Sequence, residues 1–297
     1  AGADTAEVTD SDPFFAQLHP WIRPLALEGA PDAVPVAEAL ESFLRSSREV
    51  LVSHQVNRER QRRGLPPLDV LTTKWGGVRR PLPSFADRVG CSGAAVTSSA
   101  LYRGLASLLG MTHVQPEANP DLGADIARRL ELAVGLLDGQ AAFVHVHSKA
   151  PDEAGHSKLP FAKRDVLEAI DTGLGPLVAL SERAVVAVTG DHATPSSSGV
   201  LHSGDPTPFV VAGPTVRPDE QSTFGEETAA RGAFGVLRAA DLLPLLLGYA
   251  NRPRFLGHRP TTHDALALAD RPIPLRLDAK EAQNTPRQSE NPQSLLP

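Results

Sequence analysis

The sequence predicts an α/β fold whose mostly parallel β-sheet is flanked by helices. From Asp69 onward, short apolar runs alternate with amphipathic stretches, and each run is continuously apolar. Continuous runs are typical of strands that are covered on both faces, as in a parallel sheet. Alternation of strand and helix also favours right-handed crossovers between parallel strands. The predicted strands are, in order, DVLTT, GAAVTSS, AAFVHVH, AVVAVTG and PFVVAG.

Helices are predicted where apolar residues recur at steps of three and four, because this spacing places them on one helical face. Three segments have this pattern: VPVAEALESFLRSSREVLVSH with Val36, Leu40, Phe43, Leu44 and Leu51; GADIARRLELAVGLL with Ile126, Leu130, Val134 and Leu137; RDVLEAIDTGLGPLVAL with Val166, Leu167, Ile170 and Leu174. A last helix, AADLLPLLLGYANR, contains Pro244. We expect Asp241 to cap this helix, so that the proline falls in the first turn, where it is tolerated.

The composition excludes several classes of protein. The 297 residues carry 29 basic and 35 acidic side chains, a net charge of −6, which gives no general basic surface for nucleic acid or an anionic membrane. The single cysteine, Cys91, excludes an intrachain disulfide and fits a reducing compartment. No apolar run reaches the roughly 18 residues that span a bilayer. We therefore expect a cytoplasmic protein with no nucleic-acid and no membrane partner.

The two ends of the chain differ from its middle. The first residues, AGADTAEVTDSDPFF, lack the basic and apolar parts of a signal peptide and do not begin with methionine. We therefore expect the chain to be a piece of a longer protein. From about Ile273 the sequence becomes polar and proline-bearing, which predicts a poorly ordered tail over residues 273–297.

Side chains of the types that bind metal ions follow two of the predicted strands. Asp152 and His156 follow AAFVHVH, Asp191 and His192 follow AVVAVTG, and His202 comes ten residues later. In open α/β sheets, the loops after the strands converge on a ligand-binding crevice. An isolated Asp-x-x-x-His or Asp-His pair is usually a surface pair. All five residues together, in this topology, predict a metal site.

The ligand types also indicate the metal and its chemistry. Carboxylates and imidazoles without a thiolate suit divalent zinc, manganese or iron rather than a copper or iron–sulfur site. We expect Mn²⁺ or Zn²⁺, with Mg²⁺ as a further choice. Five ligands are too many for one four-coordinate ion that keeps an open position, so two ions are the better count. Paired ions stabilise the attacking and leaving oxygens of a phosphoryl displacement. We therefore expect phosphoryl transfer or hydrolysis.

Several dispersed segments resemble those of the archaeal-type, cofactor-independent phosphoglycerate mutases of the alkaline phosphatase superfamily. They are, in the family's order, VTDSDP, HQVNRERQRRGLPP, GLASLLGM, FVHVHSKAPDEAGH, AVTGDHATP, HSGDPTPFVVAG and FGEETAARGAFGVLRAADLLPLLLGYANR. The resemblance covers about residues 8–252. It implies an alkaline-phosphatase-like sheet, part of an inserted cap domain, and interconversion of 3-phosphoglycerate and 2-phosphoglycerate without 2,3-bisphosphoglycerate.

The resemblance also implies the roles of the metal ligands. Asp152, His156 and His202 would hold one ion, and Asp191 and His192 would contribute to the second. In this family an aspartate and a nucleophilic serine near the start of the full-length chain complete the second site. The serine takes the phosphoryl group from one hydroxyl of glycerate and returns it to the other.

The sequence departs from the family before VTDSDP, where only seven residues stand in place of a substantial N-terminal region. No residue here substitutes for the missing aspartate and serine. Thr97, Ser98 and Ser99 carry hydroxyl groups but belong to a later strand. Three explanations remain open: the chain is a fragment, a second polypeptide supplies the missing part, or the protein has lost catalysis.

Further cationic and polar residues are candidates for binding a small phosphorylated acid. Arg103 stands where related enzymes tend to have lysine and would bind the transferred phosphoryl group, the alternative being an exposed arginine at a helix start. Residues that would grip the phosphate or carboxylate of the substrate, unless they have structural roles, are His54, Asn57, Lys74 and Arg79.

We expect residues 1–85 to form the later part of the cap-like substrate domain and residues 86–272 to form the α/β metalloenzyme core. A phosphoglycerate mutase is the main hypothesis. The alternatives are a phosphomutase or phosphatase acting on another small phosphoester or phosphonate, and a non-catalytic metal-binding subunit.

Overall fold

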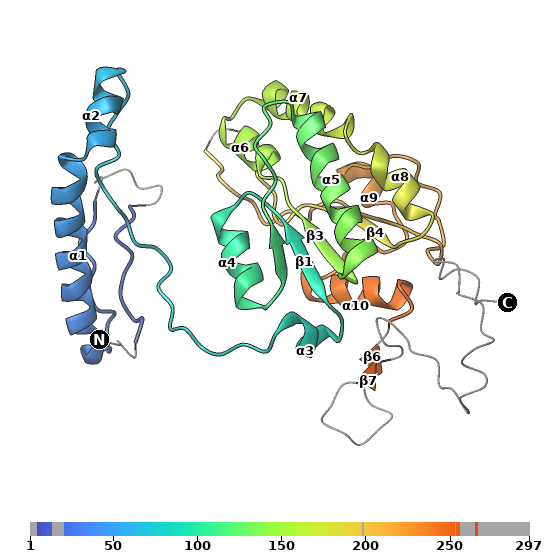
Figure 1. Ribbon diagram of the computed structural model, residues 1–297, viewed down its shortest axis with the longest axis horizontal. Helices are drawn as coiled ribbons and strands as arrows, with labels where there is room; N and C mark the ends of the chain where they lie inside the picture. Colours follow the sequence, from blue (N-terminus) through green and yellow to red (C-terminus); the bar gives the residue numbers. More distant parts are fainter. Residues whose placement is uncertain (1–4, 14–20, 198, 253, 256–264, 267–297) are drawn as a thin grey trace, which may run out of the picture. The chain divides into compact units, whose positions relative to one another are not determined.

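The computed structural model describes residues 5–13, 21–197, 199–252, 254–255 and 265–266. The chain forms two compact units, Ala1–Pro81 and Leu82–Pro297 (Figure 1). The boundary between the two units lies four residues before the one that we expected. Phe85, which we assigned to the first part of the chain, belongs to the core of the second unit. The predicted tail over residues 273–297 lies outside the described residues.

The first unit is built around two consecutive helices. A 3-10 turn, Pro31–Ala33, leads into α1 (Val34–Val52), and α2 (Gln55–Arg62) follows. Leu44 is 2% exposed and anchors α1, whereas the neighbouring Phe43 is 57% exposed. Only part of the predicted apolar stripe therefore faces inward.

The prediction of a strand at DVLTT is wrong, because residues 65–84 form neither helix nor strand. Hydrogen bonds involving a buried serine hold this segment instead. The backbone N–H of Ser11 donates to the Thr73 carbonyl oxygen at 3.0 Å, and the Thr73 N–H donates to Ser11 Oγ at 2.7 Å. The Ser11 hydroxyl oxygen thus accepts a hydrogen bond that a backbone carbonyl oxygen would accept in a regular β-ladder.

The second unit contains the predicted parallel sheet. Its strands are β1 (Gly93–Val96), β2 (Thr112–Val114) and β3 (Phe143–Val146), in the order β2-β1-β3. Helix α4 (Ala100–Leu108) connects β1 to β2 and packs on both, and α5 (Leu122–Gly139) connects β2 to β3 and packs on β3 and β1 (Figure 1).

In the central strand β1, the prediction that a continuous apolar run is covered on both faces is confirmed. Ala94, Ala95 and Val96 follow one another, so their side chains point alternately to opposite faces, and all three are at most 4% exposed. The sheet is therefore enclosed at its centre, as continuous apolar patterns predict.

The predicted strands AVVAVTG and PFVVAG form β4 (Val186–Thr189) and β5 (Phe209–Ala212), but they pair antiparallel in a sheet of their own. Parallel pairing requires a crossover, usually through a helix. No helix lies among the described residues of the connecting segment 190–208. The chain therefore returns directly beside β4.

The segment RDVLEAIDTGLGPLVAL forms two helices rather than one. Helix α6 (Ala150–His156) is followed by α7 (Pro160–Asp171) and α8 (Gly175–Ser181). The break falls at Gly173, where a Cβ atom would collide with the carbonyl oxygen of Gly123 at the start of α5. The close approach of two backbones explains the glycine and the interruption.

The last helix also begins earlier than predicted. Helix α10 (Ala239–Tyr249) has Arg238, not Asp241, at its N-cap, so Pro244 lies in the second turn. Asp241 instead accepts a 2.8 Å hydrogen bond from the Arg238 guanidinium. Leu247 of α10 joins a core cluster with Phe85, Val89 and Cys91.

The remaining elements are short: α3 (Phe85–Val89), α9 (Glu226–Ala229), β6 (Arg254–Phe255) and β7 (Ala265–Leu266). Of the helices described, none has both the length and the apolar character needed to cross a membrane.

Candidate metal centre

Helix α6 presents two of the predicted ligands together. Asp152 and His156 are four residues apart, so they lie on the same helical face. His156 Nε2 is 3.3 Å from Asp152 Oδ1. The helix starts four residues after β3 ends, which brings both side chains to the carboxyl end of the sheet.

His202 joins this pair from a later loop. One ligand atom from each of Asp152, His156 and His202 lies within 4.8 Å of the other two. The His156 and His202 rings meet edge to face with centroids 4.9 Å apart, and the His192 ring is 4.3 Å from that of His202. An isolated bridge between Ala193 and Ser203 holds the two loop segments side by side.

Asp191 points toward a group that the sequence analysis did not identify. Its Oδ2 accepts a 2.8 Å hydrogen bond from the Tyr102 hydroxyl, and its Oδ1 accepts a 3.0 Å bond from the backbone N–H of His192. Desolvation alone would raise the pKa of Asp191, but the Tyr102 hydrogen bond and the His192 charge lower it below its usual value. Burial and the Asp191 carboxylate raise the pKa of Tyr102 to about 12.

Two further histidines lie beside Tyr102. The Tyr102 ring centroid is 4.0 Å from that of His147 and 5.8 Å from that of His145. The two histidines are two residues apart at the end of β3, a spacing that places them on one face of a strand. This alternation in FVHVH was the only sequence signal for them.

Desolvation within this cluster lowers the pKa of His145 and of His147, although the Asp191 carboxylate acts in the opposite direction on both. Both rings are therefore neutral near pH 7, the form in which imidazole accepts a hydrogen bond or binds a metal.

We expect the metal-free chain to lose thermal stability as the pH falls below 6.5. The unfolded chain protonates histidine near the ordinary value of 6.5. In the folded chain the pKa of both rings is lower, so as the pH falls the unfolded state binds protons before the native state does. The free energy of unfolding therefore decreases until the native rings are protonated as well. Melting temperatures in EDTA at pH 7.5 and 5.5 measure this. The double variant His145→Gln, His147→Gln should show a smaller drop; an equal drop would contradict the assignment.

Thr194 lies at the middle of the ligand group and was also missed. It is 4% exposed, and its hydroxyl contacts Asp152, His192 and His202. Its place in the turn TGDHATP, two residues after His192, was the available signal. The side chains that contact this hydroxyl are one carboxylate and two imidazoles. His156 lies beside Asp152 and His202, and the resulting set of one carboxylate and three imidazoles fits Zn²⁺ or Mn²⁺.

The predicted phosphoryl-binding residue is exposed on α4. The Arg103 side chain has neither a hydrogen bond nor an ion pair with the residues that the structure describes. The hydroxyl residues before α4 are engaged elsewhere: Thr97 is fully buried, and Ser98 Oγ accepts a 2.8 Å hydrogen bond from Arg129.

The four predicted substrate-binding residues lie in the first unit. His54 is the N-cap of α2, and its Nδ1 accepts a hydrogen bond from the Val56 N–H. Asn57 is buried, and its amide bonds to backbone groups of Leu51 and Leu68. This arrangement gives Asn57 a structural role in joining α2 to the following segment.

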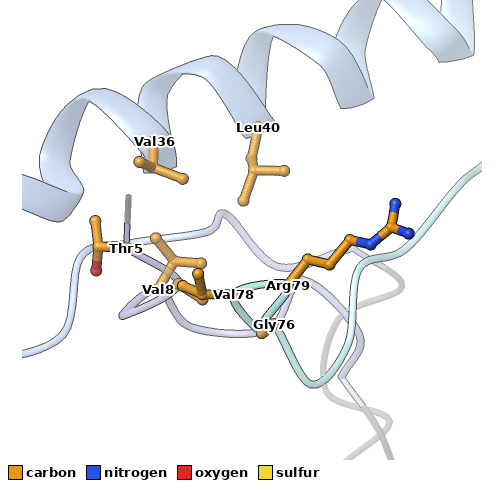
Figure 2. Close-up of a pocket in the computed structure, with 9 residues that line it drawn as sticks. Thr5, Val8, Val36, Leu40, Gly76, Val78 and Arg79 are labelled. Carbon is orange, nitrogen blue, oxygen red and sulfur yellow. The ribbon is translucent and has the colours of Figure 1, made fainter. Parts of the chain in front are cut away.

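Lys74 and Arg79 lie on the segment after α2. The Lys74 ammonium is 3.9 Å from Asp12 and lies 4.4 Å above the Trp75 ring. Arg79 borders a cavity of about 420 Å³, which is otherwise lined mainly by small and apolar residues (Figure 2). The other residues that line it are Thr5, Ala6, Val8, Val36, Leu40, Gly76, Gly77 and Val78.

Comparison with known proteins identifies relatives over most of the chain. It is 35% identical over 253 residues to the 2,3-bisphosphoglycerate-independent phosphoglycerate mutase of Methanoculleus marisnigri, covering 84% of this chain and 60% of the relative. The corresponding enzyme of Thermoplasma volcanium is 36% identical, with 84% and 61% covered. The chain thus spans about 60% of the length of these curated relatives.

A solved structure supports the fold. The PH0037 protein from Pyrococcus horikoshii matches with a TM-score of 0.66 and 33% sequence identity, covering 77% of this chain and 61% of that one. The resemblance stated from the motifs is confirmed by these relatives. A family model described as the metalloenzyme superfamily matches residues 66–248, more than half of the sequence, and the chain belongs to that superfamily.

Proposed function

We propose that this chain is the metal-binding part of a cofactor-independent phosphoglycerate mutase, which interconverts 3-phosphoglycerate and 2-phosphoglycerate. The observation that carries the proposal is the grouping of Asp152, His156 and His202 within 4.8 Å, in a chain that resembles enzymes named for this reaction. Localisation in the cytoplasm is part of the proposal, supported by the single cysteine.

Asp152, His156 and His202 would hold one divalent ion, and Asp191 and His192 would provide part of a second site. Mn²⁺ and Zn²⁺ suit this donor set best, with Mg²⁺ as a further choice. When bound, the ions supply positive charge that stabilises the oxygens of a phosphoryl group in transfer. The hydrogen bonds from Tyr102 and from the His192 N–H hold both oxygens of Asp191 in place.

Arg103 would contact the phosphoryl group, since its exposed guanidinium can donate two parallel hydrogen bonds. His54, Lys74 and Arg79 would contact the acid substrate from the first unit, whose role as part of a cap domain belongs to the same proposal. Asn57 would support them by fixing the backbone of the segment that follows α2.

An aspartate and a nucleophilic serine would come from outside this chain, either from a preceding segment or from a second polypeptide. The share of the relatives that the chain spans, about 60%, supports this arrangement. The chain's own residues would then bind and orient the phosphoryl group, while the added serine would carry it between the two hydroxyls of glycerate.

Phosphorus NMR tests the proposal. The chain is incubated with Mn²⁺ and 3-phosphoglycerate, alone and together with the N-terminal segment of a full-length relative. Formation of 2-phosphoglycerate in the mixture is expected. Free phosphate alone would favour a phosphatase, and binding of Mn²⁺ without any reaction would favour a non-catalytic subunit. Asp191→Ala should abolish turnover in the mixture while the circular dichroism spectrum of the chain stays unchanged.

A further inference from the structure

The Thr194 hydroxyl occupies a central position among the proposed ligands. It lies 2.7 Å from Asp152 Oδ1, 3.2 Å from His192 Nδ1 and 3.2 Å from His202 Nδ1. Asp152 and His202 belong to the first proposed metal site and His192 to the second. One buried side chain therefore contacts both sites.

The hydrogen-bonding capacity of a hydroxyl fixes the direction of each of these contacts. A threonine hydroxyl has one proton to donate and two lone pairs to accept with, and an ionised carboxylate can only accept. The proton therefore goes to Asp152, and the two imidazoles must act as donors through Nδ1–H. A neutral imidazole with a proton on Nδ1 has its free lone pair on Nε2.

We propose that Thr194 is a positioning residue that holds His192 and His202 in the Nδ1–H tautomer and so presents their Nε2 atoms to the metals. This inference rests on the proposed metal sites and adds to them the choice of ligand atom and a direct link between the two positions. The hydroxyl also orients the Asp152 carboxylate, because Oδ1 accepts its proton.

The position of Thr194 is itself tightly determined. Its carbonyl oxygen accepts a 2.8 Å hydrogen bond from Lys163 Nζ of α7. On the α6 side, a Cβ atom at Gly155 would lie 2.6 Å from that oxygen and 2.8 Å from Thr194 Cγ2, so only glycine allows this packing. Lys158 adds hydrogen bonds to the carbonyl oxygens of Pro195 and Val200. The hydroxyl is thus held at a fixed place relative to Asp152 and His156.

Isothermal titration with Zn²⁺ tests this role in the whole chain. Thr194→Val keeps the shape of the side chain and removes the hydroxyl, so zinc affinity should fall by about 10- to 100-fold, as is usual when the partner of a ligand is lost. Thr194→Ser restores the hydroxyl and should bind zinc close to the wild-type affinity. Thr172→Val, which removes a hydroxyl that donates a hydrogen bond to the Ala169 carbonyl oxygen at the end of α7, is the matched control and should leave zinc affinity unchanged.

Two-bond ¹H–¹⁵N NMR of the chain labelled with ¹⁵N-histidine reads the tautomers directly in the wild-type protein. In the zinc-loaded wild type, His192 and His202 should both carry a proton on Nδ1, with zinc on Nε2 of His202; His192→Gln and His202→Gln assign the signals. Zinc on Nδ1, or unchanged affinity in Thr194→Val, would overturn the role of Thr194 and leave the metal site standing. Failure of the wild type to bind zinc would overturn both.

Discussion

Replacing Arg129 with methionine is expected to destabilise the second unit by about 3–5 kcal/mol, the usual effect of removing one partner of a buried ion pair. Arg129 and Asp125 lie one turn apart on α5, and their side chains are only 8% and 9% exposed. The guanidinium Nε lies 2.6 Å from Asp125 Oδ2. Without it, the Asp125 carboxylate would remain buried and unpaired.

The same guanidinium connects α5 to the proposed metal centre. Its Nη1 donates a 3.0 Å hydrogen bond to the His147 carbonyl oxygen, and its Nη2 donates a 2.8 Å bond to Ser98 Oγ. These acceptors follow β3 and β1, so Arg129 fixes the carboxyl ends of two adjacent strands. We therefore expect the methionine variant to bind metal more weakly as well as to unfold more easily.

Urea unfolding followed by far-ultraviolet circular dichroism measures the effect. Arg128→Met is the matched control, since Arg128 pairs with Glu131 on the exposed side of the same helix at 3.0 Å. An exposed pair contributes at most about 1 kcal/mol. The double variant Asp125→Leu, Arg129→Met removes both charges and should recover much of the loss. If Arg129→Met and Arg128→Met lower the free energy of unfolding by the same amount, the buried ion pair between Arg129 and Asp125 does not stabilise the second unit as proposed.

The helices and the central strands could be predicted because their patterns are local. The 18 residues of α5 repeat apolar side chains on one face, and Ile126 and Leu130 are buried as expected. Strand β2 was missed because Thr112–Val114 has three residues, too few to show a period. The break at Gly173 does have a local signal, because TGLGP carries two glycines and Pro176, which disfavour one continuous helix. The close approach of α5 explains why Gly173 has no side chain.

The pairing of β4 with β5 could not be predicted from composition for a related reason. Both strands are apolar, but in the structure their burial alternates between half-buried and exposed residues. The orientation of β5 follows from the helix-free connection over residues 190–208 rather than from the strands themselves.

In the candidate site, the acidic and imidazole side chains can be recognised in the sequence by residue type. The residues that hydrogen-bond to them cannot. Tyr102 reaches Asp191 across 89 positions of sequence, and no spacing rule relates the two. Thr194 stands two residues after His192 in the sequence, but its role follows only from its burial among three of the proposed ligands. Side chains that act through a ligand therefore become visible only in three dimensions.

The second large effect is expected at Asp152, where replacement by asparagine should abolish tight binding of one metal ion. In the proposed arrangement Asp152, His156 and His202 would supply three ligands to the first site, as many protein ligands as catalytic zinc sites commonly have. Asp191 and His192 would supply only two to the second site, which should bind weakly without the outside aspartate and serine. The change should therefore exceed the 10- to 100-fold loss that is usual for an outer partner.

Native mass spectrometry and zinc titration count the ions, and thermal melting gives an independent measure. A ligand present at 100 times its dissociation constant stabilises the native state by about 2.7 kcal/mol, so zinc should raise the melting temperature of the wild type but not of Asp152→Asn. Glu153→Gln is the matched control, because it makes the same change of charge one residue along α6 on an exposed side chain. If both variants bind zinc equally well, Asp152 is not the carboxylate that holds the ion. The alternative site would then consist of His192, His202 and Asp191, whose Oδ2 lies 3.7 Å from His192 Nε2.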